Sequence, residues 1–448
     1  MRVPSSSADR LLAIDVGTQS ARAALFDAAG TLLAIERVPF EPYVSPRPGW
    51  AEQDPDLYWR AIGEATRGLV GRPAAGPVDA IAGLALTTQR STVVVTDDAG
   101  EALRPAIVWP DQRRTEGLRP IGGTLGLAFR VLGVRGTVAA FAADAEANWI
   151  ARHEPDVWRA TKRYLLLSGY LSHRLVGRFV DSDACQVGYL PFDFRRRRWA
   201  APGDWRWRIS PVRPEQLPDL VPPTARLGEL TPSAAGHLGL PVGLPVVAAA
   251  ADKACEVLGS GALDPTIGAI SYGTTATVNT THARYVEPIR LVPPYPAALP
   301  GRWSLEIEVH RGYWLVEWFK REFGEREVAD AARLGVPPET LLDELLATTE
   351  PGAAGLLLQP TWSPGIRVPG PEARGAVVGF SDVHTRAHLY RAILEGIAFA
   401  LREGLERTES RSGVPVEELR VAGGGARSTR VLQLTADAFG RPAAVPHT

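Results

Sequence analysis

Acids, hydroxyls and glycines directly follow several apolar runs of this sequence, and side chains in such positions could bind phosphate or move a proton. In residues 11–27, Asp15 ends the first run, Gly17-Thr18-Gln19-Ser20 turns the chain, and a second β-prone run ends at Asp27. Gly17 lets the backbone approach a ligand, because it has no Cβ and tolerates a positive φ. The hydroxyls, amide and N–H groups after it could cradle a phosphate and its metal. Taken alone, the stretch fits a surface hairpin with an acid at its shoulder equally well.

Two later apolar runs end in polar clusters. The predicted strand 80–86 leads into Thr88-Gln89-Arg90-Ser91-Thr92, and the run 105–109 leads into Asp111-Gln112-Arg113. Strand ends are where ligands bind in α/β domains. Gln89, Arg90, Ser91, Asp111 and Arg113 could bind a polyhydroxy compound over an aromatic floor made by Trp109. A surface network of Arg–Asp pairs with Trp109 in the core is the alternative.

Asp252 follows a third short apolar run, residues 246–251. An Asp in this position could cap the helix that follows. It could also act as a general base at a strand end. The residues around Asp252 do not decide between these two roles.

Residues 266–279 repeat the pattern of the opening hairpin, with Gly273-Thr274 at the turn and Thr275 after it. Near the end, the run 419–422 leads into Gly423-Gly424-Gly425-Ala426-Arg427, and Ser428 is predicted to cap a helix. Three glycines before a helix N-terminus let a flat group or a phosphate reach bare backbone. A duplicated α/β domain with one phosphate hairpin in each half explains the repeat.

The elements that would position these groups show ordinary sequence signals. Asp54-Pro55 predicts the start of a helix, with Asp as N-cap and Pro at the first helical position. Residues 164–171 are predicted to be helical, and residues 356–360 are predicted to form a buried strand. A long helix is predicted after Thr385. Gly396 lies on its apolar face, which indicates a close packing partner.

Composition narrows the function classes. The 448 residues suggest two domains, perhaps three, and the net charge of −1 and pI of about 6.7 give no basic field for nucleic acid. Two cysteines far apart in sequence, Cys185 and Cys255, support neither a disulfide framework nor a zinc site. No apolar stretch approaches the roughly 20 residues that span a bilayer, and no signal peptide is read. We therefore expect a cytoplasmic protein with no membrane partner.

Six segments, taken in order, make the chain resemble the FGGY carbohydrate kinases of the actin/hexokinase superfold. They are residues 14–20, 88–92, 107–113, 251–253, 271–275 and 422–428 with Gln433, Ala436 and Asp437. The resemblance covers nearly all of the chain. It implies an α/β fold of two ribonuclease H-like domains, residues 1–243 and 244–448. Each would have a mixed five-stranded sheet, with an ATP and sugar cleft between the two domains.

The resemblance also implies roles for the residues. Asp252 would be the general base of phosphoryl transfer from ATP to a hydroxyl of a small sugar or polyol, and Asp15 would help to hold Mg²⁺. Substrate contacts are expected from Gln89, Arg90, Ser91, Trp109, Asp111 and Asp252. ATP contacts are expected from Gly17, Thr18, Gln19, Ser20, Gly273, Thr274, Thr275, Gly424, Gly425, Ala426 and Ser428. A homodimer is compatible with this interpretation.

Three features depart from the family pattern. Lys253 stands where family members often carry Gln or Gly, and its ammonium would favour the carboxylate form of Asp252. Ser91 stands where glycerol kinases carry Glu, and the Met-His-Gly of xylulokinases is absent, so neither substrate follows. The chain ends at Thr448, where the family usually continues with another strand and helix. An ATPase of the same superfold and a non-catalytic sugar-binding relative are the competing hypotheses.

Overall fold

The computed structural model describes residues 9–363, 369–370 and 372–446 of the chain. The chain forms two compact units, each with its own sheet and core. The first comprises Met1–Cys255 and Pro296–Gly301, and the second comprises Glu256–Tyr295 and Arg302–Thr448. We describe the two units separately.

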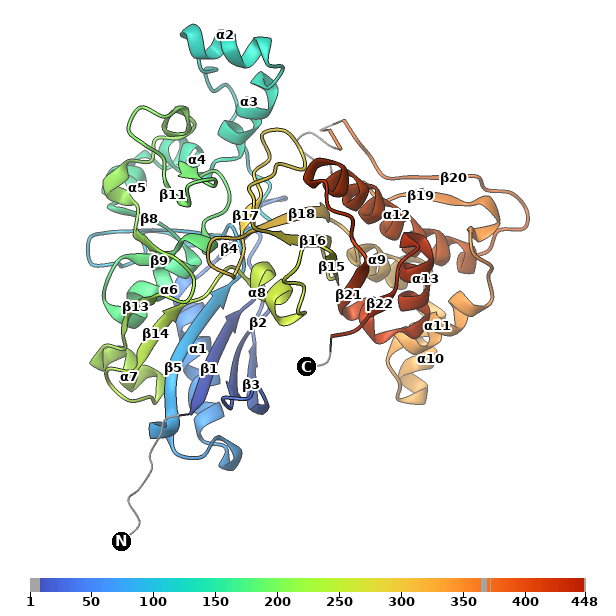
Figure 1. Ribbon diagram of the computed structural model, residues 1–448, viewed down its shortest axis with the longest axis horizontal. Helices are drawn as coiled ribbons and strands as arrows, with labels where there is room; N and C mark the ends of the chain where they lie inside the picture. Colours follow the sequence, from blue (N-terminus) through green and yellow to red (C-terminus); the bar gives the residue numbers. More distant parts are fainter. Residues whose placement is uncertain (1–8, 364–368, 371, 447–448) are drawn as a thin grey trace. The chain divides into compact units, whose positions relative to one another are not determined.

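The first unit is built on a mixed six-stranded sheet with the order β13-β14-β5-β1-β2-β3 (Figure 1). Its strands are β1 (Arg10–Val16), β2 (Ser20–Phe26), β3 (Leu32–Pro39), β5 (Ile81–Thr88), β13 (Arg226–Glu229) and β14 (Pro245–Ala248). The predicted hairpin is confirmed, since β1 and β2 pair antiparallel and the Gly17 N–H donates to the Ser20 carbonyl at 3.0 Å. Strands β1, β5 and β14 are mutually parallel, so their carboxyl ends share one edge of the sheet.

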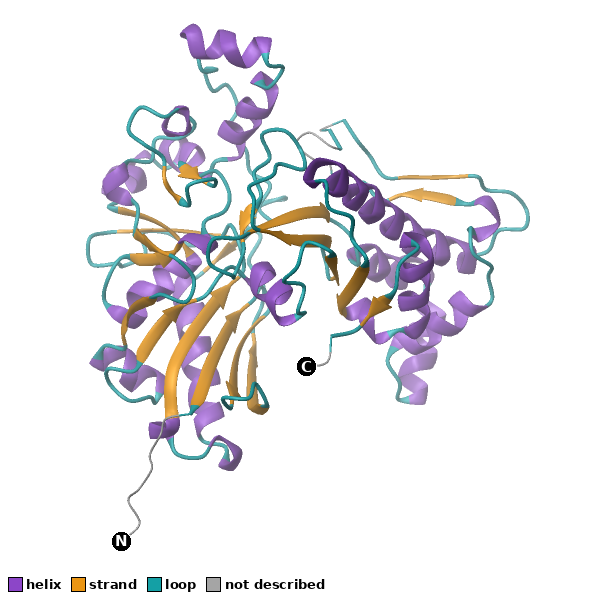
Figure 2. Cartoon of the chain, in the orientation of Figure 1, coloured by secondary structure: helices purple, strands orange, loops and turns teal. Residues whose placement is uncertain are grey.

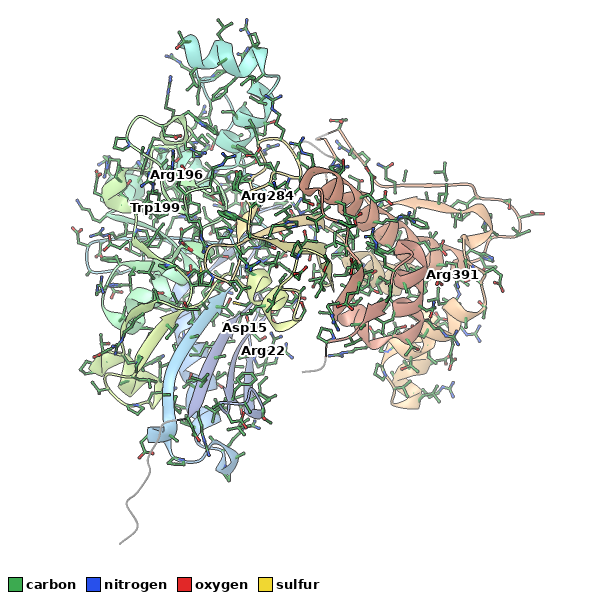
Figure 3. The ribbon with its side chains drawn as sticks, viewed as in Figure 1. Asp15, Arg22, Arg196, Trp199, Arg284 and Arg391 are labelled. Carbon is green, nitrogen blue, oxygen red and sulfur yellow. The ribbon has the colours of Figure 1, made fainter. Side chains whose placement is uncertain are left out.

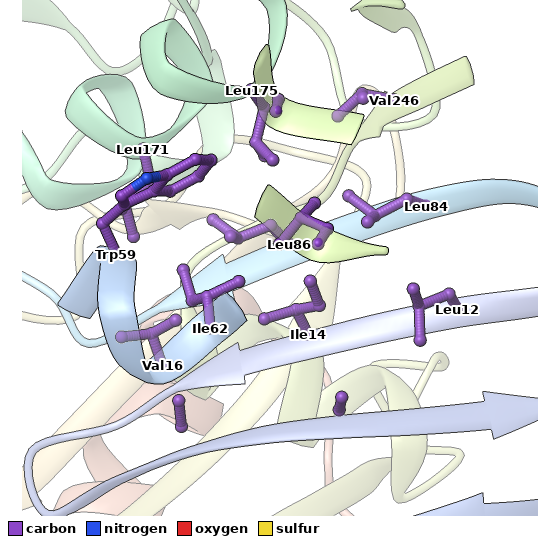
Figure 4. Close-up of a cluster of buried hydrophobic side chains, with 14 of the residues drawn as sticks. Leu12, Ile14, Val16, Trp59, Ile62, Leu84, Leu86, Leu171, Leu175 and Val246 are labelled. Carbon is purple, nitrogen blue, oxygen red and sulfur yellow. The ribbon is translucent and has the colours of Figure 1, made fainter. Parts of the chain in front are cut away.

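Apolar side chains of this sheet face helices α1 (Pro55–Val70), α6 (Leu167–Val176) and α7 (Pro232–Leu238). Leu12, Ile14 and Val16 alternate inward along β1 and are almost completely buried, as Figure 4 shows. Helix α1 begins as predicted, because the Asp54 carboxylate accepts a hydrogen bond from the Asp56 amide and Pro55 takes the first helical position.

The second unit repeats this design. Its sheet has the order β17-β18-β16-β15-β21-β22. The strands are β15 (Ile267–Tyr272), β16 (Ala276–His282), β17 (Tyr295–Pro296), β18 (Trp303–Val309), β21 (Glu418–Gly423) and β22 (Ala443–Ala444). In both sheets an antiparallel three-stranded meander is followed by two parallel strands. The duplication inferred from the two Gly-Thr turns is therefore present in the topology.

The prediction of five strands in each sheet is wrong by one strand. Each sheet carries an additional short edge strand, β13 beside β14 and β17 beside β18. Both are too short to give a clear alternation in the sequence, since β17 has two residues and β13 has four.

Five helices of the second unit, drawn in purple in Figure 2, pack on or beside a core of buried apolar side chains that belongs to this unit. They are α9 (Trp314–Phe323), α10 (Glu325–Leu334), α11 (Pro338–Ala347), α12 (Arg386–Ser412) and α13 (Thr429–Phe439). The close packing expected at Gly396 is confirmed, because a Cβ at this position would collide with the backbone carbonyl of Leu358.

Two predictions of secondary structure are wrong in part. Residues 164–171 are not one helix, because Arg163–Leu166 form β8 and pair with β6 (Val93–Thr96) before α6 begins. The strand predicted at 356–360 is present, but it is buried on one face only. Strand β19 (Leu357–Gln359) pairs with β20 (Ala376–Val378), and Leu358 is 6% exposed whereas Leu357 is 60% exposed. In both places the local structure depends on pairing with a strand that is distant in the sequence.

The remaining elements surround the first sheet or connect to it. Strands β4 (Glu52–Gln53) and β7 (Ala106–Ile107) join β6 and β8 in a small sheet, β9 (Val180–Ser182) pairs with β12 (Asp219–Val221), and β10 (Phe192–Asp193) pairs with β11 (Arg198–Trp199). The helices are α2 (Gly123–Val131), α3 (Arg135–Asp144), α4 (Glu146–His153), α5 (Pro155–Ala160) and α8 (Asp252–Gly259). Among the described residues no single helix has both the length and the apolar content needed to cross a membrane. Helices α2 and α3 together reach that length and apolar content, but the pair is bent by 117°.

Candidate functional site

The carboxyl ends of β1, β5 and β14 bring the predicted groups of the first unit to one edge of its sheet. Asp15 lies opposite Thr87 in the parallel register, and the Gln89 N–H donates to the Val16 carbonyl at 2.9 Å. Asp252 is the fourth residue after the end of β14. Residues that are up to 237 positions apart in the sequence therefore converge at this edge because three strands run in the same direction.

Asp15 is a half-exposed carboxylate at the end of β1. Its Oδ2 accepts a hydrogen bond from Nη1 of Arg22 at 2.7 Å, across the β1–β2 pair (Figure 3). Because both side chains are accessible to water, this ion pair contributes little to stability. The carboxylate can therefore take a cationic ligand at small cost.

Thr18, Gln89 and Trp109 form a chain of side-chain hydrogen bonds. The Trp109 indole N–H donates to Thr18 Oγ1 at 2.9 Å, and the Thr18 hydroxyl donates to Gln89 Oε1 at 2.8 Å. Gln89 Nε2 in turn donates to the Tyr58 hydroxyl at 3.1 Å. The structure thus brings together a residue predicted to bind ATP and two residues predicted to bind the sugar. Tyr58 was missed, because its position in α1 gave only the signal of an apolar helix face.

Ser91 adopts a left-handed backbone conformation with φ of 56°, immediately after Arg90. Such a conformation costs free energy in a residue with a Cβ and occurs often at functional sites. Thr92 returns to the extended chain before β6 begins. The sharp turn at Ser91 is consistent with a segment shaped for a ligand.

Asp111 is buried, with 3% of its side chain exposed, and it anchors the loop that carries Trp109. Its carboxylate accepts hydrogen bonds from the Ala51 amide at 2.6 Å, from the Arg113 amide at 2.9 Å, and from Nε and Nη2 of Arg113 at 2.8 and 2.7 Å. Both carboxylate oxygens already have protein partners, so substrate contact by Asp111 stays a prediction.

Arg113 packs against two indole rings that contact each other, 4.1 Å from the centroid of Trp50 and 4.5 Å from that of Trp149. The alternative of an Arg–Asp network with Trp109 in the core is therefore half right. The Arg–Asp pair exists, but it is buried, whereas Trp109 is 39% exposed.

Asp252 is the first residue of α8, and its Oδ1 accepts the Lys253 amide at 2.7 Å. The preceding residues are fixed by hydrogen bonds from the Thr87 hydroxyl to the Ala250 carbonyl at 2.7 Å and from the Ala251 amide to the Ala184 carbonyl at 3.2 Å. Burial raises the pKa of Asp252. The positive charges of Arg90 and Lys253 oppose that rise, and the negative charge of Asp15 adds to it.

The phosphate hairpin predicted in the second unit connects β15 to β16. The Gly273 carbonyl accepts the Tyr313 amide at 3.0 Å, and the Thr275 hydroxyl donates to the His310 carbonyl at 3.1 Å. The turn at Gly273-Thr274 is therefore fixed against the start of α9.

The glycine loop lies at the same edge of the second sheet, because Gly423 pairs with Tyr272 in the parallel register. Gly423 has a φ of 84°, which glycine adopts readily. Ser428 caps α13 as predicted, since its Oγ accepts the Val431 amide at 3.1 Å, and its hydroxyl donates to Asp343 Oδ1 at 2.7 Å.

Gly425 lies directly on Tyr313, so a Cβ there would collide with the Tyr313 hydroxyl. This hydroxyl is a buried polar atom for which no hydrogen-bond partner is found among the described residues. Sequence reasoning missed Tyr313, whose aromatic ring gave only the signal of an amphipathic helix.

The described residues contain no group of three or more His, Cys, Asp or Glu side chains that could hold a metal. Mg²⁺ does not require such a group, because it is usually bound by one or two carboxylates together with substrate phosphates and waters. Asp15 and Asp252 interact electrostatically at the same sheet edge. This pair of carboxylates fits a magnesium ion that also binds phosphate.

Comparisons with known proteins agree with this geometry. Residues 10–259 match the N-terminal domain, and residues 268–448 the C-terminal domain, of the FGGY family of carbohydrate kinases. A xylulose kinase from Lactococcus lactis is 29% identical, over 96% of this chain and 83% of its own length. A gluconokinase from Bacillus subtilis is 27% identical, over 98% and 84%. A crystal structure of a kinase titled xyloylose kinase, from Brucella ovis, superposes with a TM-score of 0.79 at 26% identity, covering 98% of this chain and 87% of that one.

The chain belongs to the FGGY family of carbohydrate kinases. It is a phosphotransferase with an alcohol group as acceptor, and it binds ATP. Its fold is the α/β fold of two mixed sheets found in these kinases.

Proposed function

We propose that this kinase transfers the γ-phosphate of ATP to a hydroxyl of a small sugar or polyol, with Asp252 as the general base. The observation that carries the proposal is the environment of Asp252. Its carboxyl is largely withdrawn from water, lies within electrostatic range of Arg90, Lys253 and Asp15, and begins a helix at the edge where three parallel strands end. A carboxyl whose pKa is raised by burial and lowered by nearby cations, at the end of several strands, is typical of an acid–base catalyst.

In this mechanism the Asp252 carboxylate accepts the proton of the acceptor hydroxyl while that oxygen bonds to the γ-phosphorus. The bond from phosphorus to the bridging oxygen breaks, and ADP leaves. Arg90 and Lys253 favour the ionised form that a base needs. The rate of phosphoryl transfer depends mainly on positioning and charge neutralisation. The base therefore increases the rate of a reaction whose groups are positioned by other residues.

The acceptor would be bound by Gln89, Arg90, Ser91, Trp109 and Asp111. Trp109 supplies an exposed aromatic face, and Gln89 lies beside it at the end of β5. An aromatic floor with a few placed polar groups is the usual design of a site for a polyhydroxy ligand.

The nucleotide would be bound by both predicted hairpins and the glycine loop. Gly17, Thr18, Gln19 and Ser20 offer N–H groups and hydroxyls to phosphate, as do Gly273, Thr274 and Thr275. Gly424, Gly425, Ala426 and Ser428 would contact the adenosine. The orphaned Tyr313 hydroxyl beneath Gly425 supports a ligand site at this loop.

Asp15 would hold Mg²⁺, together with phosphate oxygens and Asp252 through water. The ion would neutralise charge on the β- and γ-phosphates. Arg22, which pairs with Asp15, would have to give up part of that ion pair.

The acceptor is proposed to be a pentulose or a related ketose or polyol. The matched relatives are named for xylulose and for gluconate, and the identities of 29% and 27% leave the choice open. Ser91 and Lys253 are the positions at which this chain differs from the pattern of the resemblance, so we expect them to shape specificity. A homodimer and a cytoplasmic location are parts of the same proposal. The domain boundary expected between residues 243 and 244 differs from the division of the structure, in which β14 pairs with β5 and the first unit runs to Cys255.

A panel of ketoses, polyols and aldonates, incubated with Mg·ATP, tests the function through the release of ADP. We expect one or a few compounds to stimulate ADP release, and EDTA in excess of Mg²⁺ to abolish it. ADP release that no compound stimulates would overturn the proposal and favour an ATPase. Binding of a sugar without ADP release would favour a non-catalytic relative.

A further inference from the structure

In the chain of hydrogen bonds through Thr18, the donor is fixed by chemistry at the Trp109 end. An indole N–H is only a donor, so Trp109 must donate to Thr18 Oγ1. The Thr18 hydroxyl has a single proton, which it donates to Gln89 Oε1, and the two oxygens are 2.8 Å apart. Gln89 is 4% exposed, so water does not readily replace Thr18 as its partner.

A phosphate oxygen is only an acceptor of hydrogen bonds at neutral pH. If a phosphate binds at the first hairpin through the Thr18 hydroxyl, the proton of Thr18 must turn away from Gln89. Gln89 Oε1 then lacks its donor, and leaving a buried acceptor unpaired is costly. The cost is removed when the Gln89 amide turns over, so that Nε2 donates to the free lone pair of Thr18.

Tyr58 makes this turnover possible. Its hydroxyl accepts from Gln89 Nε2 at 3.1 Å in this structure, and a neutral phenol can equally donate to Oε1 after the amide turns. Burial raises the pKa of Tyr58, which keeps the phenol neutral at physiological pH. The group therefore serves both arrangements.

We infer that Thr18, Gln89 and Tyr58 form a relay that couples phosphate binding at the first hairpin to the acceptor site, through the indole of Trp109. The inference rests on the proposed function. It makes Thr18 and Tyr58 positioning residues for the acceptor, a role that neither the hairpin motif nor the family match assigns to them. A bound phosphate turns the Thr18 hydroxyl proton away from Gln89. This change alters the surroundings of the Trp109 indole, which is proposed to stack against the acceptor.

The direct test is a spectrum of the protein labelled with [¹⁵N]tryptophan. The chain has 12 tryptophans, and the resonance of the Trp109 indole N–H is assigned by its absence in Trp109→Phe. We expect Mg·AMP-PNP, added without any sugar, to shift this resonance in the wild-type chain and in Thr18→Ser, which keeps the hydroxyl. In Thr18→Val, which removes the hydroxyl at nearly constant volume, the resonance should start at a different position and not respond.

Binding of AMP-PNP is measured in the same samples by calorimetry, which separates two kinds of failure. If AMP-PNP does not bind the wild-type chain, the proposed kinase site is wrong. If AMP-PNP binds and the Trp109 resonance does not move, or moves equally in Thr18→Val, the relay is wrong. Thr348→Val is the matched control, because the Thr348 hydroxyl bonds only to the Leu345 carbonyl at the end of α11, and it should behave as wild type.

Kinetics give a second test with the acceptor that the panel identifies. Thr18→Val should raise the KM of the acceptor about two- to tenfold, the loss expected for one neutral hydrogen bond, and Thr18→Ser should restore it. The double variant Thr18→Val with Trp109→Phe should be no worse than the poorer single variant, because both remove the same bond. Additive effects, or a change confined to the KM of ATP, would overturn the relay.

Discussion

At the scale of single residues, the ionisation of Asp252 is controlled by its neighbours. Burial and Asp15 raise the pKa of this carboxyl, and Arg90 and Lys253 lower it. Since a general base must be ionised, kcat/KM should fall as the pH falls through that pKa. If Asp252 is the base, as we propose, Lys253 would set part of the pH range in which the kinase works.

Replacing Lys253 tests this directly. Lys253→Met removes one of the two positive charges, so the pKa of Asp252 should rise further and the acid limb of the kcat/KM profile should move to higher pH. Lys253→Arg keeps the charge and should leave the limb in place. A limb that stays unchanged in Lys253→Met would show that another group titrates there.

We expect Arg113 to stabilise the fold rather than to contact the substrate. It is 2% exposed, pairs with Asp111, and has Nη1 at 2.9 Å from Glu52. Arg113→Met would leave the buried carboxylate of Asp111 without its cation, while Glu52 would keep Arg104, so we expect the free energy of unfolding to drop by about 3–5 kcal/mol. Urea unfolding measures this loss.

The matched control for Arg113→Met is Arg159→Met. The Arg159–Asp156 pair is 76% and 86% exposed, and its removal should change stability by less than about 0.5 kcal/mol. Similar losses in the two variants would contradict the assignment of Arg113 as the buried partner of Asp111, which anchors the Trp109 loop.

At the scale of elements, the hairpins, the capped helices and the glycine loop could be predicted because their signals are local. Gly17, Asp54-Pro55 and Ser428 act on neighbours a few residues away. The strand β8 and the one-sided burial of β19 could not be predicted, since the partner strands of β8 and β19 decide their state. Apolar residues at 164–166 suit a helix and a buried strand equally well.

The contact between helix α12 and strand β19 can be tested by a substitution at Gly396. A Cβ at Gly396 would collide with the Leu358 carbonyl, which is backbone and cannot rotate away. Gly396→Ala should lower the free energy of unfolding by about 1–3 kcal/mol, although alanine favours the helix by about 1 kcal/mol.

Gly236→Ala in α7 is the control for Gly396→Ala. Nothing lies within 4 Å of the Cβ that it would add, so the helix propensity alone should act and the variant should be neutral or slightly more stable. Stabilisation by Gly396→Ala as well would mean that α12 and β19 are not in close contact.

At the scale of the whole molecule, the sequence carries its duplication in two Gly-Thr turns, and five strands of each sheet repeat one order and direction. The convergence of Asp15, Gln89 and Asp252 at one edge could be predicted from parallel strands alone. The relay through Tyr58 and the orphaned hydroxyl of Tyr313 could not, because side-chain partners 31 and more residues apart leave no local pattern.

Nucleotide binding should be visible in the stability of the chain. Mg·ADP at 100 times its Kd should stabilise the folded state by about 2.7 kcal/mol, so the midpoint of thermal unfolding should rise. Gly425→Ala, whose Cβ meets Tyr313, should reduce the rise, and Gly236→Ala should keep it. An equal rise in the two variants would place the nucleotide away from the glycine loop.

The measurement that tests the central claim most directly follows ³²P from the γ-position of ATP in the presence of the acceptor from the panel. We predict that the wild-type chain forms one labelled phosphate ester of the acceptor for each ADP. Asp252→Asn, which we expect to keep ATP binding, should do so about 10²–10⁴-fold more slowly. Label that appears only as inorganic phosphate, or equal transfer by Asp252→Asn, would contradict the assignment of Asp252 as the base of a sugar kinase.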